Sequence, residues 1–431
     1  MLLIYTHKVT PRVSYVMRQL FTGILGLEVA FTATVEEFIR HTGPKITYTR
    51  QPLQNEFFVQ SADLLFAQGT EPVHIEVSQW DGVPCFFATG GRSALPYDVF
   101  AASFYLLSRY EEYLPHEKDA HGRFSPKASL AHEHHFLQRP VVDIWAHRVL
   151  ELLRERFPEM LPGPRQYSFT SVIDVTTSHC YAYKGVIRGI SGLFLDAATL
   201  KLRRVGQRLG VWLNLIKDPY DNFAQLIQWH RSLGVHSIFF FQFADYSRFD
   251  KNVSINNNRF KALIKQVADY GVVSLAASYS SFDDLELLQK EKQQLEQVVH
   301  RPLNRSRMRY NRLAVPETYR NLVAAEFTRD YTMGYTHEMG FRAGTCTPFF
   351  FYDIPLELQQ PIKVHPFAAH DYTFRSLGTK ERAKMRLDAL YHEVKKVGGD
   401  FITVFSNELL GDEEGLGWME LYHQCLKKYH V

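Results

Sequence analysis

Short polar motifs follow buried strands at several points of this chain and bring reactive side chains to the strand ends. The run Thr170–Val175 has the pattern of a buried strand; it carries Asp174 near its carboxyl end and is followed by Thr176. A carboxylate there can accept a proton or help to hold a cation. Comparable segments occur at Ser274–Tyr279, Ser306–Tyr310, Gly340–Thr345 and Phe401–Glu408. We therefore expect one polar site assembled from several strand ends.

The order and spacing of these motifs resemble the polysaccharide deacetylase family, the NodB-like branch of the carbohydrate esterases. The resemblance is closer to a bacterial subgroup that carries an uncharacterised domain in front of the deacetylase domain. It implies an enzyme that removes an acetyl group from an amino sugar with zinc or another divalent metal. In that chemistry an Asp and two His hold the ion, a second Asp accepts a proton from the bound water, and a late His protonates the leaving group.

Carried over residue by residue, the resemblance keeps the base but changes the metal ligands. Asp174 matches the proton-accepting Asp, whereas Thr176 replaces the metal-binding Asp and Ser406 replaces the acidic His. Ala276 and Arg309 stand where the two ligand His residues are expected. Alanine has no lone pair to give, and arginine is permanently protonated and repels a cation. The sequence therefore predicts no bound metal and no cofactor.

The remaining matches predict a binding pocket around the altered positions. We expect the Arg309 guanidinium to take the place of the ion and to pair with Asp174. Aromatic and hydrogen-bonding groups around it would suit a sugar ring, since binding needs concavity and convergent polar groups rather than a metal. The predicted substrate-binding residues are Tyr279, Tyr310, Arg342, Asp371, Asn407 and Glu408.

Three other polar groups admit a functional or an ordinary interpretation. His179 and Cys180 could form an improvised metal site, although a satisfied His and a buried thiol are more common. His132, His134 and His135 lie in a predicted loop and favour a solvated surface over a metal site. Arg109, Glu111 and Glu112 end an apolar helix and predict an inter-domain contact or a solvated helix end.

The length of 431 residues favours two domains, and Leu161–Pro164 is the clearest break between them. Residues 1–160 are predicted to form an α+β domain of unknown role, with strands at Leu2–Tyr5, 46–48 and 73–77 and a helix at 97–113. Residues 165–431 alternate between strands and helices, which predicts a parallel sheet with helices outside. The expected strands are 171–174, 237–243, 272–276, 331–334 and 401–405, and the expected helices are 221–233, 257–270, 283–299, 316–327 and 378–397. The number of repeats favours an irregular (β/α)7-type deacetylase barrel with its site at the carboxyl ends of the strands.

Composition excludes several classes of protein. With 45% hydrophobic and 22% charged residues, the chain has no signature of disorder, and its net charge of +3 is too small and scattered for a nucleic-acid footprint. No stretch is long and apolar enough to span a bilayer, and no export signal is visible at the amino terminus. The widely spaced Cys85, Cys180, Cys346 and Cys425 suggest reduced thiols. We therefore expect a cytoplasmic protein.

Three functional hypotheses remain. The first is a deacetylase-like protein that has lost metal-dependent hydrolysis and binds a carbohydrate, or a partner protein, in a glycan pathway. The second is an active N-deacetylase or esterase with a rearranged site that uses Asp174 with His179 or another nearby His. The third is a structural or assembly subunit in which the barrel is a scaffold. Fold resemblance alone does not choose among them.

Overall fold

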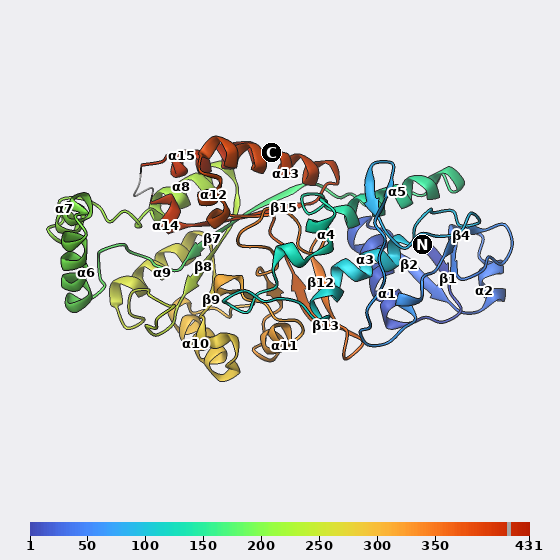
Figure 1. The fold of residues 1–431 in the computed structure, drawn as a ribbon, viewed down its shortest axis with the longest axis horizontal. Coiled ribbons are helices and arrows are strands. Elements are labelled where there is room, and N and C mark those ends of the chain that lie inside the picture. The colour runs from blue at the N-terminus through green and yellow to red at the C-terminus, as the bar shows by residue number, and fades with distance from the viewer. Residues whose placement is uncertain (412–414) are drawn as a thin grey trace.

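The computed structural model describes residues 1–411 and 415–431 and shows an elongated molecule with two sheets arranged end to end (Figure 1). The amino-terminal sheet has four parallel strands in the order β2-β1-β3-β4. These strands are β1 (Leu2–Tyr5), β2 (Val29–Thr32), β3 (Lys45–Thr49) and β4 (Phe57–Gln60). Helices α1 (Pro11–Met17) and α2 (Val35–Arg40) connect the first three strands. This alternation gives an α/β unit, which differs from the α+β arrangement expected for residues 1–160.

A second group of elements joins this sheet to the rest of the molecule. It comprises the hairpin β5 (Ser78–Trp80) and β6 (Val83–Cys85) and the helices α3 (Val99–Leu107), α4 (Leu130–Glu133) and α5 (Val141–Arg156). All residues of α3 are buried, because α3 packs against α1, α5 and a strand of the larger sheet. Asp98 caps its amino terminus by accepting the N–H groups of Phe100 and Ala101.

The larger sheet has nine strands in the order β12-β13-β11-β10-β9-β8-β7-β15-β14, and all pairs are parallel except β12 with β13. The strands are β7 (Ser168–Val175), β8 (His236–Gln242), β9 (Val272–Ala277), β10 (Arg305–Met308), β11 (Arg329–Asp330), β12 (Phe349–Asp353), β13 (Leu358–Val364), β14 (Ala369–His370) and β15 (Asp400–Ser406). The sheet is curled, since Val172 and Phe240 share an apolar cluster with Tyr331 and Phe367 from the opposite side. The predicted parallel-rich sheet is confirmed, while closure into a barrel of the (β/α)7 type stays a prediction.

Helices accompany the strands of this sheet as the alternation predicts. They are α8 (Phe223–Leu233), α9 (Asn258–Tyr270), α10 (Leu285–Val299), α11 (Glu317–Ala324), α12 (Asp371–Leu377), α13 (Lys380–Lys396), α14 (Asn407–Leu410) and α15 (Trp418–Tyr429). Two further helices, α6 (Val186–Ala198) and α7 (Leu202–Trp212), project from one end of the molecule (Figure 1). None of the helices in the described residues has the length and apolar character needed to cross a membrane.

Three expected elements differ from the structure. Residues 73–77 form no strand, and 331–334 lie beyond β11, where Asp330 accepts the backbone N–H and the hydroxyl of Thr332 and ends the ladder. The helix expected to continue to residue 113 ends at Leu107, because Arg109 adopts a left-handed conformation with φ of 55°. A short 3-10 turn, Tyr110–Glu112, follows Arg109, and its residues continue the helical spacing that the sequence shows.

A buried network of charges ties the two halves of the chain together. Arg342 follows β11 in the chain and donates to both carboxylate oxygens of Glu112, at 2.9 and 2.7 Å. Arg109 also donates to Glu112, at 2.8 Å, and to Glu111, at 2.7 Å. Arg342 is 2% exposed, and its guanidinium is held by Glu112 within this network. Substrate binding by Arg342 stays a prediction, and so does the inter-domain contact of Arg109, Glu111 and Glu112, although Arg109 and Glu112 do contact Arg342.

The two sheets are not separated by a solvated gap. A single apolar cluster runs from Leu2 and Ile4 in the first sheet, through α3 and α5, to Val175 and Phe405 in the second. The proposed division into residues 1–160 and 165–431 stays a prediction, and any two units so defined share one continuous core.

Replacing Glu112 with Gln should destabilise the protein by about 3–5 kcal/mol, because two buried guanidinium groups lose a shared counter-charge. Burial raises the pKa of Glu112, but Arg342 and Arg109 outweigh it and lower the pKa from 4.5 to about 2. The stabilisation by the ionised carboxylate is therefore present above pH 4.5 and lost as the pH falls toward 2. Urea unfolding at several pH values should show that the difference in free energy of unfolding between wild type and Glu112→Gln decreases in acid. The exposed Glu159→Gln variant is the control; equal stability of Glu112→Gln and wild type at pH 7 would contradict the role given to the network.

Candidate functional site

The strand register gathers four inward-facing positions at the carboxyl edge of the larger sheet. Asp174 on β7 is paired with Ser406 on β15, and Ala276 on β9 is paired with Arg307 on β10. Parallel strands deliver such residues to one edge, so they open into a common cavity of about 290 Å³. The cavity is lined by His121, Arg123, Asp174, Thr176, Ala276, Arg307, Met308, Arg309, Tyr310, Asn311, Thr336, His337, His370, Asp371, Tyr372, Arg375, Ser406 and Glu408.

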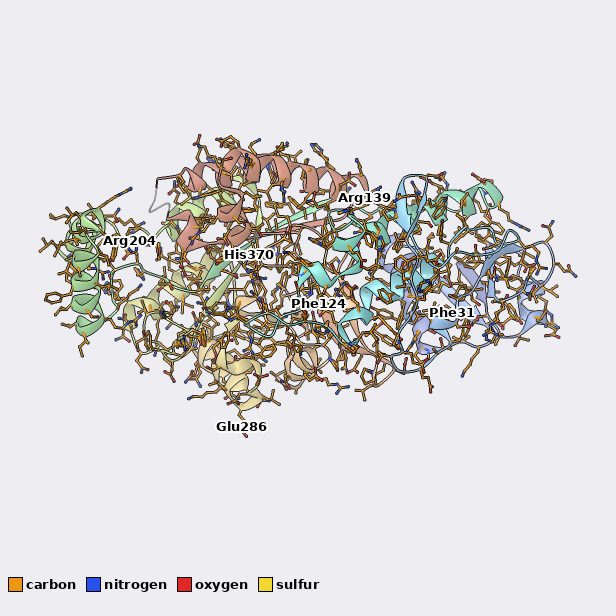
Figure 2. The ribbon with its side chains drawn as sticks, viewed as in Figure 1. Phe31, Phe124, Arg139, Arg204, Glu286 and His370 are labelled. Carbon is orange, nitrogen blue, oxygen red and sulfur yellow. The ribbon has the colours of Figure 1, made fainter. Side chains whose placement is uncertain are left out.

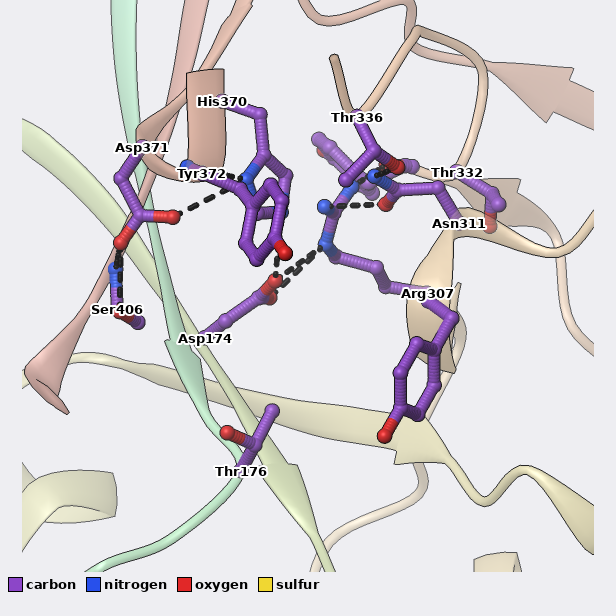
Figure 3. Close-up of polar contacts among 12 residues, drawn as sticks. Asp174, Thr176, Arg307, Asn311, Thr332, Thr336, His370, Asp371, Tyr372 and Ser406 are labelled. Carbon is purple, nitrogen blue, oxygen red and sulfur yellow. Dashed lines mark hydrogen bonds and ion pairs between the residues drawn. The ribbon is translucent and has the colours of Figure 1, made fainter. Parts of the chain in front are cut away.

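The floor of this cavity is an ion pair between Asp174 and Arg307 (Figure 3). The Nε of Arg307 lies 2.9 Å from each carboxylate oxygen of Asp174. The other guanidinium nitrogens donate to the Tyr331 carbonyl at 2.5 Å and to Asn311 Oδ1 at 2.6 Å. Phe367 lies under the guanidinium, 4.7 Å from its carbon to the ring centre. Arg307 is only 2% exposed, so its charge is held in one place.

His370 completes the charged floor from the side of β14. Its Nε2 lies 3.7 Å from Asp174, and its Nδ1 lies 3.0 Å from Asp371. Burial alone would lower the pKa of His370, but the two carboxylates outweigh it and raise the pKa above 6.5. Burial likewise opposes ionisation of Asp174 and Asp371, yet their cationic and hydrogen-bonding neighbours lower both pKa values below 3.8. At pH values below the raised pKa of His370, the groups Asp174, Arg307, His370 and Asp371 therefore form a charged cluster of two cations and two carboxylates.

The cationic partner of Asp174 is not the one expected from the sequence. Arg309 points toward the neighbouring loop, where its Nε lies 3.3 Å from Asp250 and its Nη2 donates to the Phe249 carbonyl at 3.2 Å. Strand alternation puts Arg307 on the inner face with Ala276, while the chain turns at Arg309 and Tyr310, whose φ is 59°. The prediction that Arg309 pairs with Asp174 is therefore wrong, although Arg309 does line the cavity.

The three positions that the resemblance assigns to metal ligands meet in one cavity but do not supply a metal site. Thr176, Ala276 and Arg309 all line it. The hydroxyl of Thr176 donates to Glu408 at 2.5 Å, Ala276 offers a methyl group, and Arg309 brings a positive charge. Across residues 1–411 and 415–431, no cluster of three or more His, Cys, Asp or Glu residues is placed to hold a metal ion. The donor set at these positions does not fit the divalent ion that the resemblance implies.

Ser406 stands at the position that the resemblance assigns to the family's acidic His. Ser406 donates its hydroxyl and its backbone N–H to Asp371, at 2.5 and 2.7 Å. Ser406 also caps α14 by accepting the N–H of Leu409. A hydroxyl engaged in these bonds cannot shuttle a proton near neutral pH as an imidazole can.

The predicted substrate-binding residues divide into two groups. Tyr310, Asp371 and Glu408 line the cavity. Asn407 is fully buried and donates to the carbonyls of Thr177 and Tyr220, so it fixes the loops behind the site instead. Tyr279 stacks on Phe249 with ring centres 4.1 Å apart and stands next to the cavity rather than in its wall.

A loop from the amino-terminal half closes one side of the cavity, which the sequence did not indicate. Arg123 donates to the Tyr310 carbonyl at 2.8 Å and to Thr336 at 3.0 Å. His121 lies over the Tyr310 ring, with centres 4.8 Å apart, and its carbonyl accepts a bond from Arg312 at 3.0 Å. The site is therefore shared between both halves of the chain.

The remaining unexpected residues come from the carboxyl side of β14. His370 lies near the middle of the molecule in Figure 2, close to the site that the two halves share. Tyr372 and Arg375 extend from the first turns of α12 to the rim and are exposed. The Ala369-His370-Asp371 sequence at a short strand end was the available signal, but a strand of two residues leaves no periodicity to reveal it.

The other polar groups considered from the sequence lie away from the cavity. His179 is buried, contacts Ser178 at 3.2 Å and is not part of the cavity wall. His132, His134 and His135 lie in and after the short helix α4 and do not line the cavity either.

Comparisons with known proteins give a family match for the amino-terminal part of the chain and distant likenesses to solved structures. Residues 2–158 match a family of unknown function, DUF7033. No curated protein sequence matches the chain. A structure assigned as a polysaccharide deacetylase from Mycobacterium smegmatis aligns over 63% of this chain and 88% of its own, with 14% identity and a TM-score of 0.41. A polysaccharide deacetylase from Bacillus cereus covers 62% and 88%, with 9% identity and a TM-score of 0.30.

A third similar structure is a CE4 family pseudoenzyme from Bacillus anthracis. It aligns over 62% of this chain and 64% of its own, with 10% identity and a TM-score of 0.31. Each of these likenesses concerns the fold alone. At TM-scores below 0.5, none of them supports a statement about the chemistry of this site.

Replacing His370 with Gln should reduce stability most below pH 6.5. A histidine whose pKa is raised by folding contributes its full stabilisation below its unfolded value and loses it as the pH rises through the folded value. Thermal unfolding of wild type and His370→Gln at a series of pH values should therefore show a difference in melting temperature that becomes smaller in alkaline solution. The control is His74→Gln, because the His74 ring is exposed. An NMR titration that gave His370 a pKa below 6.5 would contradict the charged cluster.

Proposed function

We propose that this chain is a polysaccharide deacetylase-like protein that binds a carbohydrate at the strand-end cavity and has lost metal-dependent hydrolysis. The observation that carries the proposal is the Arg307–Asp174 ion pair, with His370 on the other side of the same carboxylate. A general base works best with a pKa near the working pH. Asp174 has a lowered pKa and two cationic neighbours, so it is a poor proton acceptor.

The lining of the cavity suits a hydroxyl-rich ligand. Asp371 and Glu408 present carboxylate oxygens as acceptors, and the exposed Arg375 supplies donors at the rim. Tyr372 provides an exposed aromatic side chain at the rim, and aromatic faces pack well against the C–H face of a sugar ring. Four arginines against three carboxylates line the wall, which favours a neutral or acidic sugar over a cationic one.

A hydrolase with a rearranged site is a second candidate, and His370 is the observation that favours it. It is the nearby His that such a site needs, and its raised pKa makes it a proton donor. Against this candidate, His370 is held between two carboxylates, and Ser406 and Thr176 already donate their hydroxyls to carboxylates. The proposed location is the cytoplasm. If the chain binds no carbohydrate in the experiment below, a structural or assembly role is favoured instead.

Saturating N-acetylglucosamine oligosaccharides should raise the apparent melting temperature, since a ligand at 100 times its Kd stabilises the native state by about 2.7 kcal/mol. Tyr372→Ala should weaken binding by roughly tenfold through loss of an aromatic contact at the rim. Tyr270→Ala is the matched control, because Tyr270 is 54% exposed, Tyr372 is 53% exposed, and Tyr270 lies outside the cavity. Differential scanning fluorimetry and titration calorimetry make the measurement. Absence of binding to these and to glucose oligosaccharides would contradict the proposal and favour a structural role.

Restoring the three ligand positions should create metal affinity. The triple variant Thr176→Asp, Ala276→His and Arg309→His places three donors in one cavity, and we expect about one zinc per chain by mass spectrometry of the ion content. Any single reversion should leave zinc binding near the wild-type level, because one ligand cannot hold the ion against the remaining substitutions. A wild-type protein that retained one zinc per chain and released acetate in a His370-dependent reaction would favour the second candidate.

A further inference from the structure

The hairpin formed by α6 and α7 carries a large apolar surface that the rest of the described chain does not cover. Val186, Ile187 and Phe194 on α6 are 75%, 85% and 72% exposed. In the loop and at the start of α7, Leu200 and Leu202 are 81% and 71% exposed. Leu213 and Leu215, beyond α7, are 67% and 74% exposed. Monomeric proteins rarely expose contiguous apolar surface of this kind unless it meets a partner or a membrane.

The hairpin is a built structure and not a frayed segment. A Cβ atom at Gly189 would lie 2.7 Å from the Trp212 ring, so glycine allows the two helices to approach closely. Asp196 on α6 accepts a bond from Arg208 on α7 at 2.6 Å, and both side chains are 11% exposed. Arg188 fastens the hairpin to the body through the carbonyls of Lys251 and Asn252. The exposed apolar residues therefore stand on a firmly packed pair of helices.

Helical spacing puts these apolar residues on one side of each helix. Val186, Ile190 and Phe194 follow one another every four residues, and Ile187 lies seven before Phe194. On α7, Leu202 and Leu209 are also seven residues apart. The packed positions Gly189 and Asp196 lie on a different side of α6, so internal packing does not use up the apolar face.

The segment from residue 183 to 217 is positively charged, which indicates the kind of surface that the hairpin would bind. Between residues 183 and 217 seven residues are Lys or Arg, and the single acidic residue, Asp196, is the one paired within the hairpin. The whole chain has a net charge of only +3, so positive charge is concentrated here. Lys201 and Arg203 are exposed beside the apolar Leu200 and Leu202. Arg204, at the same end of the hairpin, is labelled in Figure 2.

We propose that the α6–α7 hairpin docks the protein onto an anionic lipid membrane by laying its apolar face into the interface. Amphipathic helices with Trp, Phe and Leu on one side and Lys and Arg beside them lie in the plane of a membrane interface. Anionic lipid headgroups attract the basic residues, by about tenfold in affinity for each one or two cations near the surface. A second copy of the chain is a poorer occupant, because it would bring two positively charged hairpins together.

Flotation of the full chain with lipid vesicles tests this proposal. The chain should float with vesicles that contain phosphatidylglycerol, less so at high salt, and remain unbound with vesicles of phosphatidylcholine alone. Ile187→Ser with Phe194→Ser should weaken binding at least about tenfold, because two exposed apolar side chains no longer enter the interface. Lys201→Glu with Arg203→Glu should weaken it by roughly thirtyfold or more.

The matched control is Leu356→Ser with Met385→Ser, since these side chains are 52% and 66% exposed and lie outside the hairpin. It should float like the wild type. Absence of flotation, equal flotation with neutral vesicles, or equal loss in the control variant would overturn the proposal. So would a concentration-dependent dimer in sedimentation that the Ile187 and Phe194 variant abolishes, because the face would then meet a second copy. The hairpin variants should still bind oligosaccharides at the cavity. Failure of membrane docking can therefore be distinguished from failure of the proposed carbohydrate binding.

Discussion

The ion pair between Arg307 and Asp174 constrains the chemistry that the carboxyl edge of the sheet can perform. A guanidinium that is 2% exposed has lost most of its hydration and must be compensated by fixed acceptors. Asp174, the Tyr331 carbonyl and Asn311 provide those acceptors, and Phe367 closes the space below. Freeing the Asp174 carboxylate for proton transfer would leave Arg307 buried and uncompensated. The pair therefore stabilises the floor of the cavity and removes a base at the same time.

The amino-terminal half takes part in this site in two ways. Glu112 fixes Arg342, and hence the segment that follows β11, while Arg123 fixes the turn at Tyr310. Both contacts are charge-assisted bonds with little exposure to solvent, so they restrict the geometry more than surface pairs would. Residues 1–160 therefore help to shape the cavity and do not act only as a separate module.

The sequence revealed the elements whose pattern is local and concealed those that depend on distant partners. Strands β7, β8, β9 and β15 and the helices α8, α9, α10, α11 and α13 were predicted because buried apolar runs and helical spacing are local signals. Strands β11 and β14 have two residues each and owe their existence to pairing, so no pattern could show them. The hairpin α6–α7 was also missed, although Val186, Ile190 and Phe194 already have helical spacing in the sequence.

The same distinction between local patterns and distant contacts explains which residues of the site were predicted from the sequence. Asp174, Thr176, Ala276, Ser406 and Glu408 were located from motifs at strand ends, and all five line the cavity. Arg309 was given the partner that belongs to Arg307, because spacing along the chain does not show that the backbone turns at Tyr310, where φ is 59°. His121 and Arg123 reach the cavity from about fifty residues before β7, and only the three-dimensional structure relates them to Tyr310.

Topology relates the cavity to the hairpin. The hairpin is inserted between β7 and α8, so it leaves the sheet from the carboxyl end of β7, which is the end that carries Asp174. The cavity opens at that same edge, and Thr176 begins the segment that leads to α6. Because the polar floor is internally paired, a ligand gains its contacts mainly from rim groups such as Tyr372 and Arg375, which are exposed. The segment that leads to the hairpin and the rim of the cavity therefore start from the same edge of the sheet.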